Sequence, residues 1–503
     1  MTGGHRTSLV ALLVALLVAL LVAVLVAVLA LLAGCTGHGI VSPAFADPVP
    51  PARQAEPVPP AQPSPQRPVV SLAFDVASDL RSATGREDVV VTPDLPTCEL
   101  VFRATPNKPT AARTGSALEV TSARVGGTPV TPRTEAAGAP AGSPGALVVL
   151  PLPQCAAAGT PVRAELAFTL RLGADADERI GVSPSTGTAW FGSGFPLLTW
   201  VRGEGWTRDP EVTIYGESTT SEDFRLAALD VTAPSNLAVA GTGVAGGTSP
   251  GPTGGTTTHR FTADAVRDVA VAVGRYRVTE RTVAGGVRLH LFTPASGVRV
   301  APEIWADELD GALRDTTGLL GAYPYQDLWV AIAPAQSDGT EFPSALQFGD
   351  VSRATLRPLA LHELAHQWFY AAVGNNQSRD PWIDEAFATW TEKTIVGRDG
   401  DDTLASVPDA VAGRLGWSMP RWSGLGFDRY VTGVYTQGAA ALTEARRRAG
   451  PERFDGAVRA YLATNAHRVV RVDDVTRAFA DVPEALDTLR RAGALPAAPG
   501  GVR

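Results

Sequence analysis

The chain has 503 residues, which is enough for two or three domains. Hydrophobic residues make up 45% of the sequence and charged residues 19%, and both fractions are typical of a globular protein. The formal net charge is −8, and the sequence has no basic run and no interleaving of basic with aromatic residues, which argues against nucleic acid as a partner.

Residues 1–35 predict export and attachment to a membrane. An unbroken apolar run covers residues 9–33 and leads into LAGC, a pattern similar to a bacterial lipobox in which Cys35 is acylated after cleavage. The run exceeds the usual core of a signal peptide, and about 20 apolar residues suffice to cross a bilayer. An uncleaved membrane helix is therefore the alternative. Both interpretations anchor the protein on the extracytoplasmic side of the cell membrane.

Residues 36–68 are rich in proline and alanine and have no apolar periodicity, so they predict a semi-rigid, extended tether. The chain has three cysteines. If Cys35 carries lipid, Cys98 and Cys155 remain as an even pair, which can form a disulfide in an oxidising compartment. Two buried free thiols are the alternative.

Residues 69–297 predict an amino-terminal β domain. Short apolar or alternating runs recur between clusters of Gly, Pro, Asn and Ser, for example at residues 69–74, 146–150 and 163–170. Strands at this spacing favour an antiparallel sandwich or a curved sheet. The glycine-rich segment 243–258 is predicted to be a hairpin loop or spacer, because it lacks the lysine and the strand-to-helix setting of a phosphate-binding loop.

Residues 298–503 predict a second, mainly helical domain. Pro302 is predicted to begin a helix, since apolar residues follow it at roughly helical spacing. Residues 328–333 then predict a buried strand. Beyond Ala440 the pattern is helical, with one helix that ends at Gly450.

The second domain contains His362-Glu363-Leu364-Ala365-His366. Positions i and i+4 of a helix lie on one face, so the two imidazoles can bind one zinc ion and the intervening glutamate can activate a water. Pro358 is predicted to begin this helix and Gly374 to end it. A helix whose histidines are satisfied by ordinary hydrogen bonds is the alternative.

Glu385 is predicted to be the third zinc ligand. A second helix is expected from Trp382 to about Val396, with Gly397 as its stop. Two helices joined by a tight loop pack antiparallel, so Glu385 can face the two histidines. Three protein ligands leave the fourth position open, as in catalytic rather than structural zinc sites.

HELAHQWF followed by WIDEAFATW resembles the membrane alanyl aminopeptidase family, gluzincin zinc peptidases with the pattern HExxH-x18-E. The resemblance implies one zinc ion per chain, with His362, His366 and Glu385 as its ligands and Glu363 as general base. It also implies a role for Glu392 behind the metal site. A solvated helix carboxylate is the alternative for Glu392.

The family binds the free α-amine of its substrate through a glutamate on an edge strand, in a Gly-x-Met-Glu-Asn motif. Here residues 338–342 keep that glutamate as Glu341 but differ at other positions. Gly339 to Pro343 resembles better a branch with Gly-Met-Glu-Tyr-Pro. The resemblance implies that Glu341 binds the amine, and a strand residue that faces solvent is the alternative.

A tyrosine motif of the family has its counterpart in residues 430–438. The resemblance implies that Tyr435 hydrogen-bonds the oxyanion and that Tyr430 is a second tyrosine of the substrate pocket. Gln437 replaces the usual lysine. A half-buried packing residue is the alternative for Tyr435.

The resemblance therefore implies an α+β multidomain protein, with a β domain followed by a thermolysin-like catalytic domain and without the large carboxy-terminal helical domain of bigger members. The expected function is hydrolysis of peptide bonds by a membrane-anchored zinc metallopeptidase, as an aminopeptidase that acts on peptides. The alternatives are a zinc endopeptidase or oligopeptidase without amine recognition, and a catalytically silent binding protein.

Overall fold

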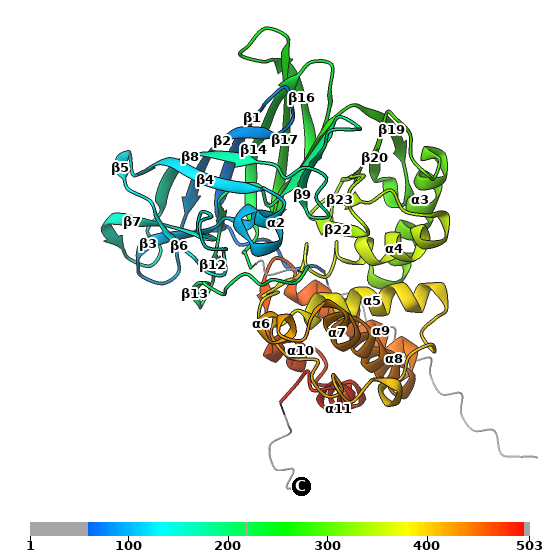
Figure 1. Cartoon of the computed structure of the whole chain (residues 1–503). Helices are drawn as coiled ribbons and strands as arrows, with labels where there is room; N and C mark the ends of the chain where they lie inside the picture. The colour runs from blue at the N-terminus through cyan, green and yellow to red at the C-terminus, as the bar shows by residue number, and fades with distance from the viewer. Residues whose placement is uncertain (1–58, 217–219, 497–503) are drawn as a thin grey trace, which may run out of the picture. The chain divides into compact units, whose positions relative to one another are not determined.

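The computed structural model describes residues 59–216 and 220–496, which lie in one unit, Pro57–Arg503 (Figure 1). The predicted export segment with Cys35, and residues 36–58 of the predicted tether, lie outside the described residues. Within the described ranges, none of the helices has both the length and the apolar character that a bilayer span requires.

The last residues of the predicted tether are bound to the folded chain. The backbone N–H of Ala61 donates to the carbonyl of Ala463 at 2.8 Å, and Arg67 Nε donates to the carbonyl of Asp264 at 2.9 Å. Ala61 and Arg67, which the sequence assigned to the tether, therefore contact the folded chain. Composition gave no sign of this, because any extended segment can be held through its peptide groups.

The largest sheet of the β domain has eight strands, in the order β16-β17-β14-β1-β2-β8-β4-β5. These strands are β1 (Val69–Val76), β2 (Ser82–Val91), β4 (Ala117–Val125), β5 (Thr128–Val130), β8 (Val162–Arg171), β14 (Phe224–Pro234), β16 (Val244–Pro250) and β17 (Thr256–Val266). Alternate side chains of β2 and β8 are buried, as expected for a sheet with one covered face. Because β1 pairs parallel with β14, the sheet is mixed and not wholly antiparallel as predicted.

Aromatic side chains fill the space under this sheet. The ring centroid of Phe74 lies 5.7 Å from that of Phe168 and 5.1 Å from that of Phe191. Gly85 in β2 lies directly against Phe168, since a Cβ at this position would come within 2.1 Å of the ring. The same core cluster includes Trp329 of the second domain, so apolar packing continues from one domain into the other.

Two four-stranded sheets and a short two-stranded ladder complete the β domain, in the orders β15-β18-β10-β9, β11-β3-β7-β6 and β12-β13. Their strands are β3 (Thr97–Arg103), β6 (Arg133–Glu135), β7 (Leu147–Ala156), β9 (Ile180–Ser183), β10 (Thr188–Gly192), β11 (Leu197–Leu198), β12 (Trp200–Val201), β13 (Gly205–Trp206), β15 (Ala238–Gly241) and β18 (Ala270–Gly274). A short helix α2 (Pro109–Arg113) and a 3₁₀ turn η1 (Thr105–Asn107) follow β3.

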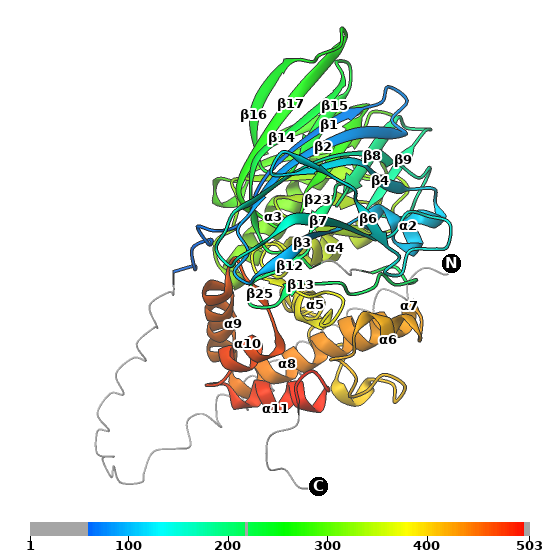
Figure 2. The ribbon, with the colours of Figure 1, turned by 90° about the vertical axis from the view of Figure 1, so that its left-hand side faces the viewer.

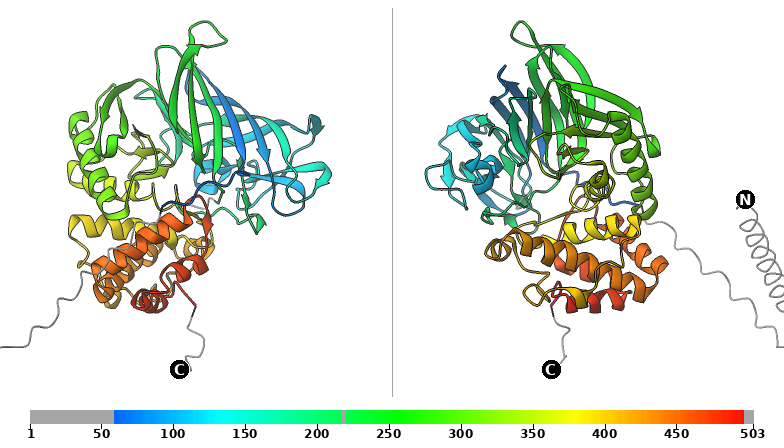
Figure 3. Two further views of the ribbon diagram at one scale, coloured as in Figure 1. Left: turned by 180° about the vertical axis from the view of Figure 1, so that it is seen from behind. Right: turned by 45° about the vertical axis from the view of Figure 1, so that its right-hand side comes forward.

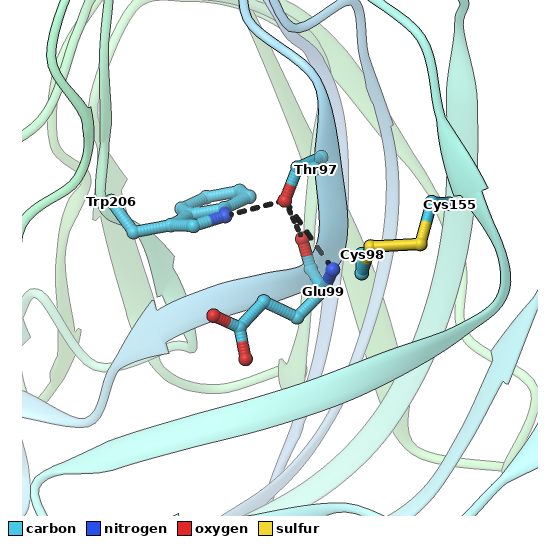
Figure 4. The surroundings of a disulfide bond; sticks show 5 residues. All are labelled: Thr97, Cys98, Glu99, Cys155 and Trp206. Atoms are coloured by element: carbon cyan, nitrogen blue, oxygen red, sulfur yellow. Dashed lines mark hydrogen bonds between the residues drawn. A yellow bond between two sulfur atoms is a disulfide. The ribbon is translucent and has the colours of Figure 1, made fainter.

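A disulfide joins Cys98 in β3 to Cys155 in β7, so these residues are not free thiols (Figure 4). The neighbouring residue Thr97 accepts a hydrogen bond from the Trp206 indole at 2.9 Å and donates to the Glu99 carbonyl at 2.8 Å. The two cysteines lie 57 positions apart in the sequence.

The glycine-rich segment 243–258 contains all of β16 and the start of β17, and only residues 251–255 connect the two strands (Figure 2). The prediction of a loop or spacer was therefore wrong for the first half of the segment. A ladder needs only backbone hydrogen bonds, so an exposed edge strand can be rich in glycine and serine.

A five-stranded sheet, in the order β19-β20-β21-β23-β22, begins the second domain. Its strands are β19 (Tyr276–Thr282), β20 (Arg288–Pro294), β21 (Asp327–Ile332), β22 (Gly339–Phe342) and β23 (Ala345–Phe348). Helix α3 (Pro302–Leu320) connects the parallel strands β20 and β21, and a 3₁₀ turn η2 (Ala284–Gly286) connects β19 and β20. Strands β19 and β20, which the sequence assigned to the β domain, therefore pair into this sheet, because a strand's own pattern does not tell which sheet it joins.

The remaining chain is mainly helical, and Figure 3 shows its yellow-to-red helices together below the strands. These elements are α4 (Arg353–Ala365), β24 (Gly374–Asn375), α5 (Trp382–Val396), the 3₁₀ turn η3 (Leu404–Ser406), α6 (Met419–Ser423), α7 (Phe427–Tyr430), the π-helical turn η4 (Val431–Thr436), α8 (Gln437–Ala449), α9 (Pro451–Asn465), β25 (Val469–Val470), α10 (Val472–Ala478) and α11 (Pro483–Arg491).

The helix that carries the histidine motif differs from its prediction at both ends. α4 begins after Ser352, whose side chain accepts a hydrogen bond from the Thr355 backbone, and Pro358 lies inside the helix. The helix ends at Ala365, and Gly374 lies in the short strand β24, which pairs with β25. The Ser352 cap, and not Pro358, determines where the helix begins. Gly374 pairs with a distant strand, and the local sequence does not show this pairing.

Candidate metal centre

Three side-chain atoms converge between α4 and α5. His362 Nε2 and His366 Nε2 lie 3.2 Å apart, and Glu385 Oε2 lies 3.3 Å from the first and 3.4 Å from the second. A tetrahedral zinc ion with ligand distances of about 2.0–2.1 Å separates its ligands by about 3.3 Å. The three residues therefore fit one zinc ion, and the structure brings together the ligand set that was expected from the sequence.

The charge around these atoms favours a cation. Burial lowers the pKa of His366, but the charges of Glu341 and Glu385 outweigh burial and raise this pKa to about 9. Burial also opposes protonation of His362, whereas Glu385 and Glu392 raise its pKa. Both imidazoles are thus in surroundings that stabilise positive charge, which a bound metal ion would supply.

Each ligand is oriented by a second contact. His366 Nδ1 lies 3.2 Å from the Phe369 carbonyl, and donation to it leaves Nε2 free to bind a metal. Glu392 Oε2 lies 3.6 Å from His362 Nδ1, and its side chain is 18% exposed. The structure therefore places Glu392 next to a ligand rather than in open solvent.

The first turns of α5 hold Glu385 in a fully buried setting. Gln377 donates to Asp384 Oδ2 at 2.9 Å, and the backbone N–H of Glu385 donates to Asp384 Oδ1 at 2.9 Å. Burial and the adjacent Glu385 raise the pKa of Asp384 to about 7. The left-handed cap at Gly397, with φ of 70°, ends the helix where it was predicted to end.

The proposed base, Glu363, lies beside the edge strand β22. A Cβ at Gly339 would come within 2.5 Å of the Glu363 carboxyl, so this close approach requires glycine. Burial, and the charge of Glu341, raise the pKa of Glu363. Its Oε2 atom is buried without a hydrogen-bond partner among the described residues.

Glu341 is on β22 as expected, and it is only 5% exposed. The alternative of a strand residue that faces solvent is therefore wrong. Its Oε1 atom has no hydrogen-bond partner within residues 59–216 and 220–496. A buried carboxylate oxygen without a donor is suited to bind an ammonium group.

The two tyrosines lie together over the ligands. The Tyr435 ring stacks on His362 with centroids 5.8 Å apart, and its hydroxyl donates to Glu385 Oε1 at 2.5 Å. The Tyr430 ring meets Tyr435 edge-on at 5.5 Å and is fully buried. The π-helical turn η4, which the sequence did not reveal, brings these residues five positions apart onto one face.

Several residues of the β domain near this site were not predicted. Arg179, Ser193 and Asp268 are buried close to Glu341 and to Tyr370, which follows the histidine motif. They flank β9, β10 and β18, which are neighbouring strands of one sheet, but they are far apart in the sequence and carry no local motif. The only signal in the sequence is a charged segment before β9 at residues 175–179.

No family model matches this chain, and no curated protein sequence matches it. Solved structures do match it. The M1 zinc metallopeptidase from Deinococcus radiodurans superposes with a TM-score of 0.59 at 20% identity, over 87% of this chain and 96% of its own. A mutant of that enzyme bound to a Tyr-Ser-Ala substrate gives 0.60 at 20% identity, over 86% and 95%. A mutant two-domain M1 zinc metallopeptidase bound to L-tryptophan gives 0.60 at 19% identity, over 86% and 95%.

These similarities show the fold of this chain. It is the multidomain α+β fold of the M1 zinc metallopeptidases, with an amino-terminal β-rich domain and a catalytic domain that is largely helical. His362, His366 and Glu385, whose geometry fits one zinc ion, lie within that fold.

Proposed function

We propose that this protein is a zinc-dependent peptidase that removes residues from the amino end of peptides. The observation that carries this proposal is the triangle of His362, His366 and Glu385 atoms, with edges of 3.2–3.4 Å. Glu363 and Glu341 are buried carboxylates that each have an oxygen without a partner among the described residues. The neighbour that binds Tyr-Ser-Ala, a peptide, supports the same substrate class.

In this proposal each side chain has one task. A zinc ion held by the three ligands would polarise the scissile carbonyl and lower the pKa of a water. Glu363 takes the proton of the attacking water at Oε2 and passes it to the leaving amine. Tyr435, whose hydroxyl now donates to Glu385, turns that O–H toward the developing oxyanion. Glu341 Oε1 accepts hydrogen bonds from the ammonium group of the substrate.

The test is to measure bound zinc and hydrolysis of aminoacyl fluorogenic amides, with and without a chelator. The wild-type protein should hold about one zinc ion per chain and lose activity with chelator. Glu363→Gln should keep the metal, while kcat falls by roughly 100- to 10,000-fold. Wild-type protein that binds no zinc would favour the silent binding protein, and near-wild-type turnover by the variant would exclude Glu363 as the base.

An endopeptidase or oligopeptidase that does not recognise the amine remains a second candidate, because residues 338–342 depart from the family motif around Glu341. Free and N-acetylated peptides of one sequence separate the two. An aminopeptidase should cleave only the free peptide, and Glu341→Gln should weaken that preference. Equal cleavage of both peptides would favour the second candidate.

We also infer that the protein acts outside the cytoplasm, anchored through residues 1–35. The apolar run and Cys35 support this inference, and so does the disulfide between Cys98 and Cys155, since such bonds persist in oxidising compartments. The mass of the mature amino-terminal fragment tests it. A lipid-modified Cys35 or an intact residue 1 would distinguish the lipoprotein from the membrane helix, and a fragment found in the cytoplasm would contradict both.

A further inference from the structure

Arg179 is a buried cation next to the predicted amine-binding strand. It is 2% exposed and lies just before β9. Its guanidinium carbon is 5.3 Å from the ring centroid of Phe342, the residue that follows Glu341. Burial lowers the pKa of Arg179, but the charges of Glu341, Tyr370 and Asp268 outweigh it and raise the pKa. The guanidinium is therefore held as a cation beside the strand that carries Glu341.

Phe342 fixes this geometry. It stands where the family motif has asparagine, and its ring lies against Gly192 so closely that a Cβ there would come within 1.9 Å of the ring. The guanidinium of Arg179 lies on the ring as well, and Arg179 Nη1 donates to Ser193 Oγ at 3.2 Å. The ring of Phe342 in β22 thus packs against β10 of the β domain.

Asp268 is the second anion of this cluster and is completely buried. Its Oδ2 accepts hydrogen bonds from Ser193 Oγ at 2.5 Å and from the Tyr370 hydroxyl at 3.1 Å. Tyr370 lies four residues after His366 and has a φ of 101°, which a non-glycine residue rarely adopts. The hydrogen bonds therefore run from the end of the metal-binding helix to the residues around Arg179.

We propose that Arg179 is a positioning residue for recognition of the substrate's free amine, which it serves by holding Glu341 in place as a carboxylate. The inference rests on the proposed function, in which Glu341 binds that amine. One guanidinium and the carboxylates of Glu341 and Asp268 leave one net negative charge for the ammonium group. Without the guanidinium, two buried carboxylates would repel each other in one low-dielectric region, and this repulsion would displace Glu341 from the amine site. In this proposal Arg179 acts through Glu341 and does not bind the substrate itself.

The first experiment compares Arg179→Gln with the wild-type protein on an aminoacyl amide. KM should rise by about tenfold or more, because a charge-assisted contact is lost from the amine site, while kcat changes much less. Arg179→Lys keeps the charge and should restore part of the loss in KM. An unchanged KM in Arg179→Gln would overturn the proposal, and so would a fall in kcat alone.

The second experiment is a double-mutant cycle with Glu341→Gln. If Arg179 acts through Glu341, adding Arg179→Gln to Glu341→Gln should change KM by less than about twofold. Effects that multiply across the two positions would overturn the proposal. Wild-type protein that hydrolyses the amide upholds the proposed function whatever the cycle shows, and wild-type protein without hydrolysis overturns both.

Arg103→Gln is the matched control, because Arg103 is also a buried arginine of the β domain and pairs with Glu211 at 2.6 Å. It should lower thermal stability but leave KM unchanged, and a KM shift like that of Arg179→Gln would overturn the proposal. Should Arg179→Gln fail to fold, the charge-balanced pair Arg179→Gln with Asp268→Asn replaces it. In that folded pair Glu341 keeps the one net negative charge, so KM should stay within about threefold of the wild-type value. A rise of about tenfold or more would overturn the proposal.

Discussion

At the scale of single residues, Glu87 is a carboxyl group buried in the β domain far along the chain from the metal centre. It lies in β2 and is 2% exposed, and neither carboxyl oxygen has a hydrogen-bond partner in the described part of the chain. Burial, and then the charge of Asp88, raise the pKa of Glu87 well above its ordinary value. The folded protein thus contains a carboxyl group that stays protonated when most others are ionised.

The sign of its effect on stability follows from proton binding. In the unfolded chain this carboxyl loses its proton near its ordinary pKa of about 4.3, whereas the folded chain keeps the proton to a higher pH. The folded state therefore binds more protons above that pH. The contribution of Glu87 to the free energy of unfolding is most favourable below about pH 4 and falls as pH rises toward the folded pKa.

Glu87→Gln should therefore raise the free energy of unfolding more at pH 8 than at pH 5, by roughly 1–3 kcal/mol, because the amide cannot ionise. Urea unfolding at the two pH values measures this difference. Glu119→Gln, on the exposed part of β4, is the control and should change neither value. An equal effect of Glu87→Gln at both pH values would show that ionisation of Glu87 does not contribute.

At the scale of elements, local signals predicted some helices well and others badly. The bounds of α5 were predicted because Gly397 must adopt a left-handed conformation and ends the helix by itself. The start of α4 was misplaced because Pro358 suits a first turn, although Ser352 provides the actual cap. The ligand set was predictable, since spacing along two helices fixes it, whereas Arg179 and Asp268 approach Glu341 only through the tertiary fold.

Gly339→Ala tests how tightly β22 is packed on α4. The added methyl group would meet the Glu363 carboxyl at 2.5 Å and push it from its position, so kcat should fall by about tenfold or more. Bound zinc should not change, because Gly339 touches none of the ligands. Gly318→Ala is the control, since it lies exposed in α3 with open space around its Cβ and should leave kcat unaltered. Full activity of Gly339→Ala would mean that the base has room to move.

At the scale of the whole molecule, the apolar core of the β domain extends onto the sheet of the second domain. Phe261 of the β domain meets Trp329 of the catalytic sheet edge-on, with ring centroids 5.3 Å apart. The indole of Trp329 also donates to the Gly243 carbonyl at 2.7 Å. Cores that interlock in this way unfold together, so the β domain should report on events at the metal centre.

Removal of zinc should therefore lower the stability of both domains at once. Metal that binds only the folded state adds about 4 kcal/mol at a concentration 1,000 times its Kd, and a chelator removes this contribution. Calorimetry should show one transition with zinc and one transition at a lower Tm without it. A thermogram in which only part of the heat absorption shifts would show that the domains unfold independently.

The contact between the Phe342 ring and Gly192 limits how such a protein can evolve. The ring occupies the volume that any side chain at position 192 would need. A related protein cannot have a larger residue at position 192 while it keeps an aromatic ring at position 342. If Arg179 is replaced, the ring at position 342 also loses its contact with the guanidinium. We therefore expect positions 179, 192 and 342 to be inherited as a set and to change together in any lineage that alters one of them. The first and the last of these lie 163 residues apart in the sequence, roughly the length of a small domain.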